Sequence, residues 1–393
     1  MGVPTKLVAL LLLATVSVYM FFRNKKTITD VRPKKKKSVA IRKIDLFIES
    51  MKKKFPSLSE EQITALFPRK FEVHGHVVVV RLNNSEERGA SFVPYAELFA
   101  ASFAPIKIDV VLVDDKGIAG ELRQPAELVT AFENPVETVK YLKDAKKGVL
   151  KRYNEMKKCG KTPVYAWPEV ERILDGHLQS STFTVHIENG IRYSFDVRRV
   201  MFSSGNTTER MHFAVVDARN ETVVDMFSGI GYFTIPLAVH GGPSVIHALE
   251  KNPDSVEFIQ INAVQNGVGD IVRPQCGDNR EVGDELRGTC DRVLMGYIPS
   301  CKEFLARAVS FLKHDDEDTP RGVVHYHFLA DRHEGSEVAM QHLTEELGEF
   351  VVAKAKITDI RCVKSYAPKR YHFVADVSFL TFFFCVVFFF LFV

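Results

Sequence analysis

Cysteine is scarce in this sequence, and its spacing excludes the commonest cysteine-based sites. The 393 residues include six cysteines, and no two of them form a Cys-x-x-Cys pair. Structural zinc sites need closely spaced Cys and His ligands, and small secreted domains need a dense cysteine framework. The pattern predicts a protein without a metal or disulfides, in a reducing, cytoplasmic compartment.

Net charge is also low, but it is unevenly distributed. The chain has a formal charge of +3, while residues 1–54 alone hold fourteen Lys or Arg against three Asp or Glu. The rest of the chain is therefore net negative. Such a basic segment favours a polyanionic partner, either nucleic acid or an acidic membrane surface, although a solvated linker has the same composition.

Both ends of the chain are apolar. Residues 7–22 form an uncharged run, slightly shorter than the roughly 17 to 25 residues that span a bilayer. Basic residues follow this run, so a signal anchor would leave the body of the chain in the cytosol. A signal peptide and an organelle-targeting segment are the alternatives. Residues 379–393 are interpreted either as a membrane-dipping tail or as an artefact of gene prediction.

Composition and periodicity divide the chain into five segments. The segments are 1–38 (apolar run and basic linker), 39–129 (α+β unit), 130–180 (divergent, lysine-rich insertion outside the core), 181–378 (strands alternating with helices) and 379–393 (apolar tail). Helical spacing in the second segment restarts at Ser59, and Asn189-Gly190 predicts a hairpin turn at the start of the fourth. From residue 222 onward, strands and helices alternate as in a parallel sheet with crossover helices.

The strongest chemical signal is "VVDMFSGIGYFTIPLA", residues 223–238. An apolar strand ends at Asp225, and a turn containing Gly229 and Gly231 leads into a helix whose first N–H groups are free to bind a ligand. No third glycine completes the Gly-x-Gly-x-x-Gly pattern of nicotinamide-binding folds. The stretch therefore predicts a nucleotide site of another kind.

Polar residues after the next two strands extend this site. Glu250 follows the second strand, twenty-five residues beyond Asp225, and suits the two hydroxyls of a ribose. Asp278 and Asn279 follow the third strand and offer the acceptor and donor that an adenine edge requires. This order resembles the class I S-adenosylmethionine-dependent fold, which is α/β with a Rossmann-like parallel sheet, here preceded by a smaller α+β domain.

Longer stretches resemble one family of RNA-modifying enzymes. Residues 188–210, "ENGIRYSFDVRRVMFSSGNTTER", and the motif after them are similar to enzymes that modify the purine 3′ to the tRNA anticodon. That family contains guanine-37 N1-methyltransferases and the aminocarboxypropyltransferases of wybutosine synthesis. Stretches within residues 66–80, 291–300 and 363–377 favour the second branch. Resemblance to this branch implies transfer of the 3-amino-3-carboxypropyl group of S-adenosylmethionine to C7 of 4-demethylwyosine in the anticodon arm of tRNA(Phe). Methylthioadenosine is the expected by-product.

The resemblance also implies roles for individual residues. The expected S-adenosylmethionine contacts are Ser203, Arg210, Asp225, Gly229, Gly231, Glu250, Asp278 and Asn279. Among them, Arg210 is expected to hold the methionine carboxylate as a planar fork. Arg69, Lys70, Lys364, Lys369 and Arg370 are either tRNA phosphate contacts or an ordinary basic surface.

The stretch "DRVLMGYIPS", residues 291–300, lies where nucleobase methyltransferases carry an Asn-Pro-Pro-Tyr or Asn-Leu-Pro loop. Gly296 replaces the amide side chain. Every carbon on a sulfonium is already activated, so the enzyme mainly selects which carbon faces the base, and loss of the amide fits a changed orientation. The candidates for a general base are Asp291 and Tyr297, and Tyr297 also suits stacking on the base.

Two other functions stay open at this stage. A guanine-37 N1-methyltransferase would need the amide-containing loop that this chain lacks. A non-catalytic, membrane-tethered RNA-binding protein is suggested by the basic and apolar ends, but it would not need the cofactor residues. His74 and His76 alternate along one strand without a third ligand at suitable spacing, so we interpret them as exposed strand residues.

Overall fold

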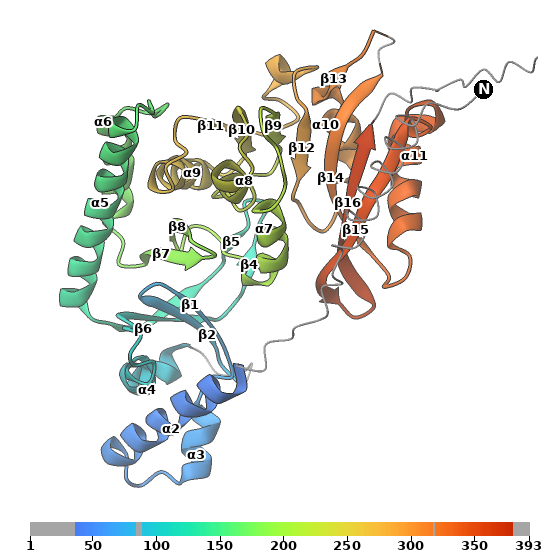
Figure 1. The fold of residues 1–393 in the computed structure, drawn as a ribbon. Helices are drawn as coiled ribbons and strands as arrows, with labels where there is room; N and C mark the ends of the chain where they lie inside the picture. Colours follow the sequence, from blue (N-terminus) through green and yellow to red (C-terminus); the bar gives the residue numbers. More distant parts are fainter. Residues whose placement is uncertain (1–35, 84–88, 317–318, 380–393) are drawn as a thin grey trace, which may run out of the picture.

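A computed structural model describes residues 36–83, 89–316 and 319–379 (Figure 1). The apolar run of residues 7–22 and nearly all of the second apolar run, residues 380–393, lie outside these ranges. Within the described ranges, no helix combines the length and the hydropathy needed to cross a bilayer. The predicted N-terminal anchor therefore concerns residues on which the structure gives no information.

The first folded unit is a four-stranded mixed sheet with helices at one end of the molecule (Figure 1). The strand order is β1-β2-β3-β6, in which β2 and β3 are parallel and the other neighbours are antiparallel. Its elements are α2 (Lys36–Lys54), α3 (Glu60–Leu66), β1 (Lys70–His74), β2 (Val77–Arg81), α4 (Gly89–Ala101), β3 (Val110–Asp114) and β6 (Leu128–Glu133). Ser59 caps α3 through reciprocal hydrogen bonds with Gln62, which confirms the predicted helix start.

The two faces of this first sheet belong to different cores. Val78 and Val80 pack with α2, α3 and α4 around Phe99. Val77 and Leu112 point to the opposite face and join the main core of the following unit. The first unit is therefore attached to the rest of the molecule by the buried side chains of its own strands.

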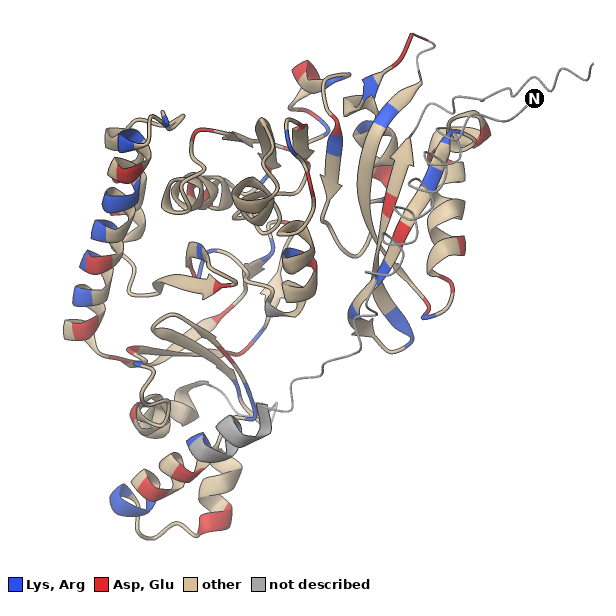
Figure 2. Cartoon of the chain, viewed as in Figure 1, with Lys and Arg blue, Asp and Glu red and all other residues tan. Residues whose placement is uncertain are grey.

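Residues 130–180 are part of the main core, contrary to the expectation of a peripheral insertion. Their helices are α5 (Pro135–Lys158) and α6 (Trp167–His177). Val149 and Leu174 are fully buried in the main core. The lysines lie on the outer surface, where Lys146 pairs with Asp175 at 2.7 Å and basic residues alternate with acidic ones along α5 (Figure 2). The many charged residues on the outer surface hide the helical period of the buried apolar residues in the sequence.

A hairpin and a short helix connect α6 to the central sheet. These elements are β7 (Phe183–Glu188), β8 (Ile191–Asp196), the 3₁₀ turn η1 (Ser204–Asn206) and α7 (Thr207–Phe213). Asn189 and Gly190 both have positive φ between β7 and β8, which confirms the predicted Asn-Gly turn.

The largest sheet has eight strands in the order β11-β10-β9-β12-β14-β16-β15, with β13 beside β14. Neighbours from β11 to β14 on this path are parallel, whereas β16 is antiparallel to β14 and β15. The strands are β9 (Thr222–Asp225), β10 (Val245–Glu250), β11 (Val272–Cys276), β12 (Arg292–Met295), β13 (Lys313–His314), β14 (Pro320–Ala330), β15 (Ala355–Ala367) and β16 (Arg370–Phe379). The helices between them are α8 (Thr234–His240), α9 (Pro253–Gln265), α10 (Leu305–Phe311) and α11 (Gly335–Val352), with 3₁₀ turns η2 (Asp284–Leu286) and η3 (Lys302–Phe304).

Helices cover both faces of this sheet, and the strand side chains alternate between them. Val223 and Ala248 lie in the core that contains α5, α6, α8 and α9, whereas their neighbours Val224 and Leu249 lie in the core that contains α10 and α11. The architecture confirms the predicted α/β class with a preceding α+β unit. Because the strand order reverses at β9, a crevice forms outside the carboxyl ends of β9 and β12.

Candidate functional site

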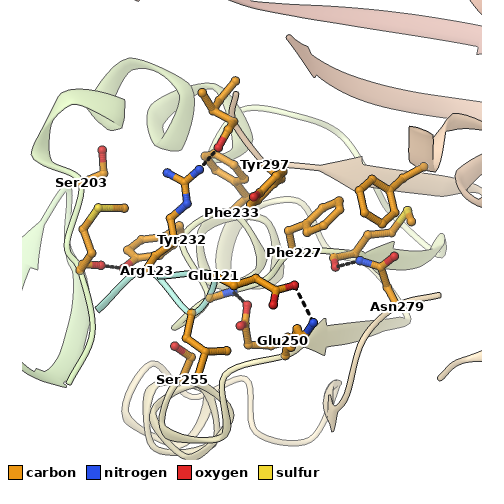
Figure 3. Close-up of a pocket in the computed structure, with 18 of the residues that line it drawn as sticks. Glu121, Arg123, Ser203, Phe227, Tyr232, Phe233, Glu250, Ser255, Asn279 and Tyr297 are labelled. Carbon is orange, nitrogen blue, oxygen red and sulfur yellow. Dashed lines mark hydrogen bonds and ion pairs between the residues drawn. The ribbon is translucent and has the colours of Figure 1, made fainter. Parts of the chain in front are cut away.

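A cavity of about 410 Å³ occupies this crevice (Figure 3). The loops after β9, β10, β11 and β12 form one side of it. Three further segments complete the wall: the turn between β4 (Ile118–Ala119) and β5 (Gln124–Pro125), residues 200–206, and the β15–β16 hairpin. Ligands of doubly wound α/β proteins bind at this edge of the sheet.

The glycine turn after β9 brings the backbone to the cavity. Gly229 has a φ of +54°, and a Cβ there would lie 2.6 Å from Cε2 of Tyr232, so a side chain does not fit. Gly231, with a φ of +94°, does not border the cavity. A Cβ at this position would meet Ile235 at 2.5 Å, so this glycine permits the close approach of α8.

Asp225 stabilises the glycine turn through hydrogen bonds on the side that faces the protein interior. Its carboxylate is fully buried, accepts hydrogen bonds from Thr234 Oγ1 at 2.7 Å and from the Phe227 N–H at 3.2 Å, and does not border the cavity. Burial raises the pKa of Asp225 to about 7, and the nearby Glu250 adds to the shift. Asp225 therefore fixes the turn that the cavity uses.

Glu250 borders the cavity at the carboxyl end of β10. Its Oε2 accepts the Gly229 N–H at 2.8 Å, and its Oε1 accepts the Asn252 N–H at 2.7 Å. Burial raises the pKa of this carboxyl, and the backbone N–H groups oppose the rise. The two N–H bonds fix the orientation of the carboxylate, which lies among the residues that line the cavity (Figure 3).

Asp278 and Asn279 lie together on the cavity wall after β11. Arg280 donates to both oxygens of Asp278, at 2.9 and 2.6 Å, and these bonds hold the pKa of that carboxyl far below its usual value. Asn279 donates its Nδ2 to the Met226 carbonyl at 2.9 Å, while its buried Oδ1 has no partner in the described part of the chain. A buried acceptor without a donor fits a ligand that supplies an N–H.

Ser203 borders the cavity, but Arg210 does not. Arg210 is 2% exposed and makes four hydrogen bonds, two to Glu188 and one each to Thr207 Oγ1 and the Ser203 carbonyl. The expectation that Arg210 forks onto a ligand carboxylate does not match this geometry, because Glu188 already occupies the fork. Arg210 instead holds the segment that carries Ser203.

The two candidates for a general base are separated by the length of β12. Tyr297 borders the cavity, and its ring packs on Phe227 at 5.2 Å between centroids. Asp291 precedes β12, at the amino edge of the sheet, where it binds Thr222 N at 2.9 Å and Lys313 Nζ at 2.7 Å. The candidacy of Asp291 is therefore wrong, because the cavity lies at the carboxyl edge.

Sequence reasoning missed two parts of the cavity. The β4–β5 turn contributes Arg123, whose Nη2 donates to the Ile298 carbonyl and whose guanidinium lies 5.0 Å from the Tyr297 ring centroid. The β15–β16 hairpin contributes Lys364 and His372. The sequence suggests for Lys364 only a tRNA phosphate contact or an ordinary basic surface, and no local pattern marks Arg123 or His372.

Several histidines are buried, and two groups of described residues offer clustered ligand atoms, but each group already contains an arginine. In the first group, His177, Asp254 and Glu257, Arg199 pairs with Asp254 at 2.9 Å. His74 and His76 are 4% and 2% exposed, so the expectation of exposed strand residues is wrong. His325, His212 and Asp376 offer ligand atoms within 4.8 Å of one another. Arg361 forms an ion pair with Asp376 at 2.6 Å, so this group already contains a cation.

The fold and the cavity together define the class of protein. A doubly wound sheet with a glycine turn after the first strand, a half-buried glutamate after the second and an Asp-Asn pair after the third has the layout of S-adenosylmethionine-dependent methyltransferase folds. Residues 184–353 match the family model described as the TRM5/TYW2 methyltransferase domain.

Known relatives place the chain within this class. It is 39% identical over 202 residues to the tRNA(Phe) (4-demethylwyosine(37)-C(7)) aminocarboxypropyltransferase of Methanocaldococcus jannaschii, covering 50% of this chain and 76% of the relative. It is 41% identical over 263 residues to the tRNA wybutosine-synthesizing protein 2 homolog of Danio rerio, covering 58% of this chain and 62% of the relative. The crystal structure of M. jannaschii TYW2 in complex with AdoMet aligns with a TM-score of 0.50 and 26% identity, over 79% of this chain and 100% of that chain. The chain belongs to the TRM5/TYW2 family.

Proposed function

We propose that the chain transfers the 3-amino-3-carboxypropyl group of S-adenosylmethionine to C7 of 4-demethylwyosine at position 37 of tRNA(Phe). The relatives at about 40% identity carry the names of this activity and of wybutosine synthesis. S-adenosylmethionine supplies an activated Cγ. When C7 of the base bonds to this Cγ, the bond between sulfur and Cγ breaks, methylthioadenosine leaves, and the base releases its C7 proton. The enzyme is an S-adenosylmethionine-dependent transferase acting on tRNA.

The cavity residues fit the parts of S-adenosylmethionine in a definite order. Asn279 and Asp278 would hold the adenine, because the free Oδ1 of Asn279 needs an N–H donor. Glu250 would accept the ribose hydroxyls, and the Gly229 backbone would lie against the cofactor. Ser203 lies on the opposite side of the cavity from Asn279 (Figure 3), so the methionine arm would extend toward Ser203.

The single observation that carries the choice of reaction is the packing at Gly296. A Cβ at this position would lie 2.6 Å from Cε2 of Phe233, so the ring occupies the space that an asparagine side chain would need. An N1-methyltransferase of this family type uses an amide there to handle the N1 proton and O6 of guanine. The filled space favours carbon alkylation, in which selecting the reacting sulfonium carbon is the main requirement.

Tyr297 is the proposed platform for the target base. Its ring borders the cavity and is supported by Phe227 on one side, while Arg123 lies near the ring. Stacking of a tricyclic base on such a ring is worth about 1 to 3 kcal/mol. The role of Tyr297 would be to place the base carbon in line with the methionine arm.

The anticodon arm of tRNA is the proposed macromolecular partner. Arg69, Lys70, Lys369 and Arg370 are exposed and supply charges that suit tRNA phosphates. The N-terminal α+β unit would provide further contacts. In the cell, we propose a cytoplasmic enzyme with membrane contact through residues 7–22, which cell fractionation of the full chain and of a deletion of residues 1–38 would test.

Identification of the nucleoside by-product tests the proposed reaction. Purified protein is incubated with S-adenosylmethionine and tRNA carrying either 4-demethylwyosine or unmodified guanosine at position 37. We expect methylthioadenosine, and only with the tricyclic base. S-adenosylhomocysteine from the guanosine substrate would instead identify an N1-methyltransferase, and absence of both products would identify a binding protein.

A further inference from the structure

Lys364 reaches the cavity at the end where the methionine arm is expected. It lies on β15, borders the cavity and donates from Nζ to Ser203 Oγ at 3.3 Å. Ser203 and Asn279 lie at opposite sides of the cavity (Figure 3). Lys364 is therefore located at the end remote from the proposed adenine position.

No carboxylate forms an ion pair with Lys364 in the described part of the chain. Its Nζ donates instead to the neutral Ser203 Oγ. Burial lowers the pKa of Lys364, the nearby Arg210 lowers it further, and Glu72 opposes the change. A half-buried ammonium group without an anion is unfavourable, so an anionic ligand group would be favoured at this point.

The backbone next to Lys364 leaves room for its side chain. A Cβ on Gly205 would lie 3.0 Å from Lys364 Nζ and 3.2 Å from its Cδ. The lysine therefore rests on the bare backbone of the 203–206 segment. His372, its partner across the β15–β16 ladder, also borders the cavity, so both strands of the hairpin contribute to this wall.

Arg210, which the sequence suggests as the ligand of the methionine carboxylate, is already paired within the protein. Arg210 directs its fork at Glu188 and does not border the cavity, as described above. Its attachment to the Ser203 carbonyl at 2.8 Å positions the segment on which Lys364 rests. Of these two basic residues near the site, Arg210 is paired with a carboxylate, whereas Lys364 has no such ion pair in the described part of the chain.

We propose that Lys364 binds the α-carboxylate of the methionine arm of S-adenosylmethionine and is the residue that distinguishes this cofactor from analogues without that group. The inference rests on the proposed function. An ammonium–carboxylate bond at the end of the arm would limit its rotation and so help to select which sulfonium carbon meets the base. Lys364 would then be a cofactor-binding residue supplied by the C-terminal hairpin rather than by the parallel strands.

The test compares three ligands on purified full-length protein by calorimetry. They are S-adenosylmethionine, its decarboxylated analogue and methylthioadenosine, which lacks the whole arm. Lys364→Met removes the charge and keeps the length of the side chain. Lys356→Met is the matched control, because Lys356 is exposed on the same strand and outside the cavity. Lys364→Arg restores a cation.

We expect Lys364→Met to weaken S-adenosylmethionine binding about tenfold or more, equivalent to about 1.4 kcal/mol. Binding of methylthioadenosine and of the decarboxylated analogue should change less than twofold. Lys364→Arg should recover part of the affinity, and Lys356→Met should behave as wild type.

Unchanged affinity of Lys364→Met for S-adenosylmethionine would overturn this inference, as would an equal loss for all three ligands. A loss of tRNA affinity alone would return Lys364 to the role of a phosphate contact. Failure of the proposed function looks different: the wild-type protein would bind S-adenosylmethionine through Lys364 but release S-adenosylhomocysteine in the by-product assay, or, as a binding protein, it would bind neither ligand.

Discussion

At the scale of single residues, two carboxylates on neighbouring strands, one half-buried and one fully buried, perform different tasks. Glu250 borders the cavity, whereas Asp225 lies below the glycine turn and bonds to Thr234. Burial raises the pKa values of both groups. Replacing each carboxylate by its amide therefore separates the effect of ligand binding, at Glu250, from the effect of supporting the glycine turn, at Asp225.

The first prediction concerns Glu250. Glu250→Gln should weaken both S-adenosylmethionine and methylthioadenosine by about 1 to 3 kcal/mol, because both share the ribose and lose charge-assisted hydrogen bonds. Calorimetry on the two ligands measures this. The control is Asp225→Asn, which should bind both within about threefold of wild type; equal losses in the two variants would mean that Glu250 only supports the turn.

The second prediction concerns the pH dependence of stability. The folded-state pKa of Asp225 is about 7, above its ordinary 3.8, so its protonated form favours the folded state. That contribution is complete below about pH 4 and is lost as the pH rises to about 7. Relative to Asp225→Asn, the wild type should therefore lose on the order of a few kcal/mol of unfolding free energy across this window.

Urea denaturation of both proteins at closely spaced pH values measures this difference. The asparagine variant keeps the size of the side chain and can still bond to Thr234. Parallel stability curves for the two proteins between pH 4 and pH 7 would show that Asp225 titrates normally.

At the scale of elements, the conformation of the loop after β12 depends on its contact with Phe233, the residue that precedes α8. Gly296 and Phe233 meet so closely that a methyl group does not fit between them. Gly296→Ala should therefore lower the free energy of unfolding by about 1 to 3 kcal/mol. Phe233→Leu combined with it should recover part of this loss, because the smaller side chain leaves room.

Denaturant titration of the two single variants and the double variant completes the cycle. Additive effects would show that the two positions are not coupled. Neither variant should release S-adenosylhomocysteine from tRNA with guanosine at position 37, because a methyl group does not replace the missing amide.

The order of the strands and helices explains which site residues can be predicted from the sequence alone. The turn glycines, Glu250 and the Asp278–Asn279 pair are predictable because each follows its own strand, and parallel strands end at one edge. Asp291 was misassigned because it is only six residues from Tyr297, yet β12 carries the chain across the sheet between them. Arg123 and Lys364 reach the cavity from distant segments, and nothing local indicates that.

At the scale of the whole molecule, the two folded units share one core. Val77 and Leu112 of the first sheet are buried with residues of α5, α6 and the central sheet. The prediction at this scale is a single unfolding transition in calorimetry, with its calorimetric and van't Hoff enthalpies equal. Leu112→Ala should lower the stability of the whole chain by about 2 to 5 kcal/mol.

Two resolved transitions, of which Leu112→Ala shifts only the first, would show that the units fold independently. The matched control is Val78→Ala, which changes the opposite face of the same sheet and the core around Phe99. Under a single cooperative transition, both substitutions should shift the same midpoint.

The position of β16 determines when the complete cavity can form during synthesis of the chain. This strand is the last of the described sheet in chain order, but it lies between β14 and β15, and together with β15 it carries Lys364 and His372 to the cavity. Another part of the cavity wall comes from Arg123, far earlier in the chain. On the ribosome, a growing polypeptide can form the glycine turn and the Glu250 strand long before the hairpin emerges. The complete pocket can therefore form only after translation has passed the final strand.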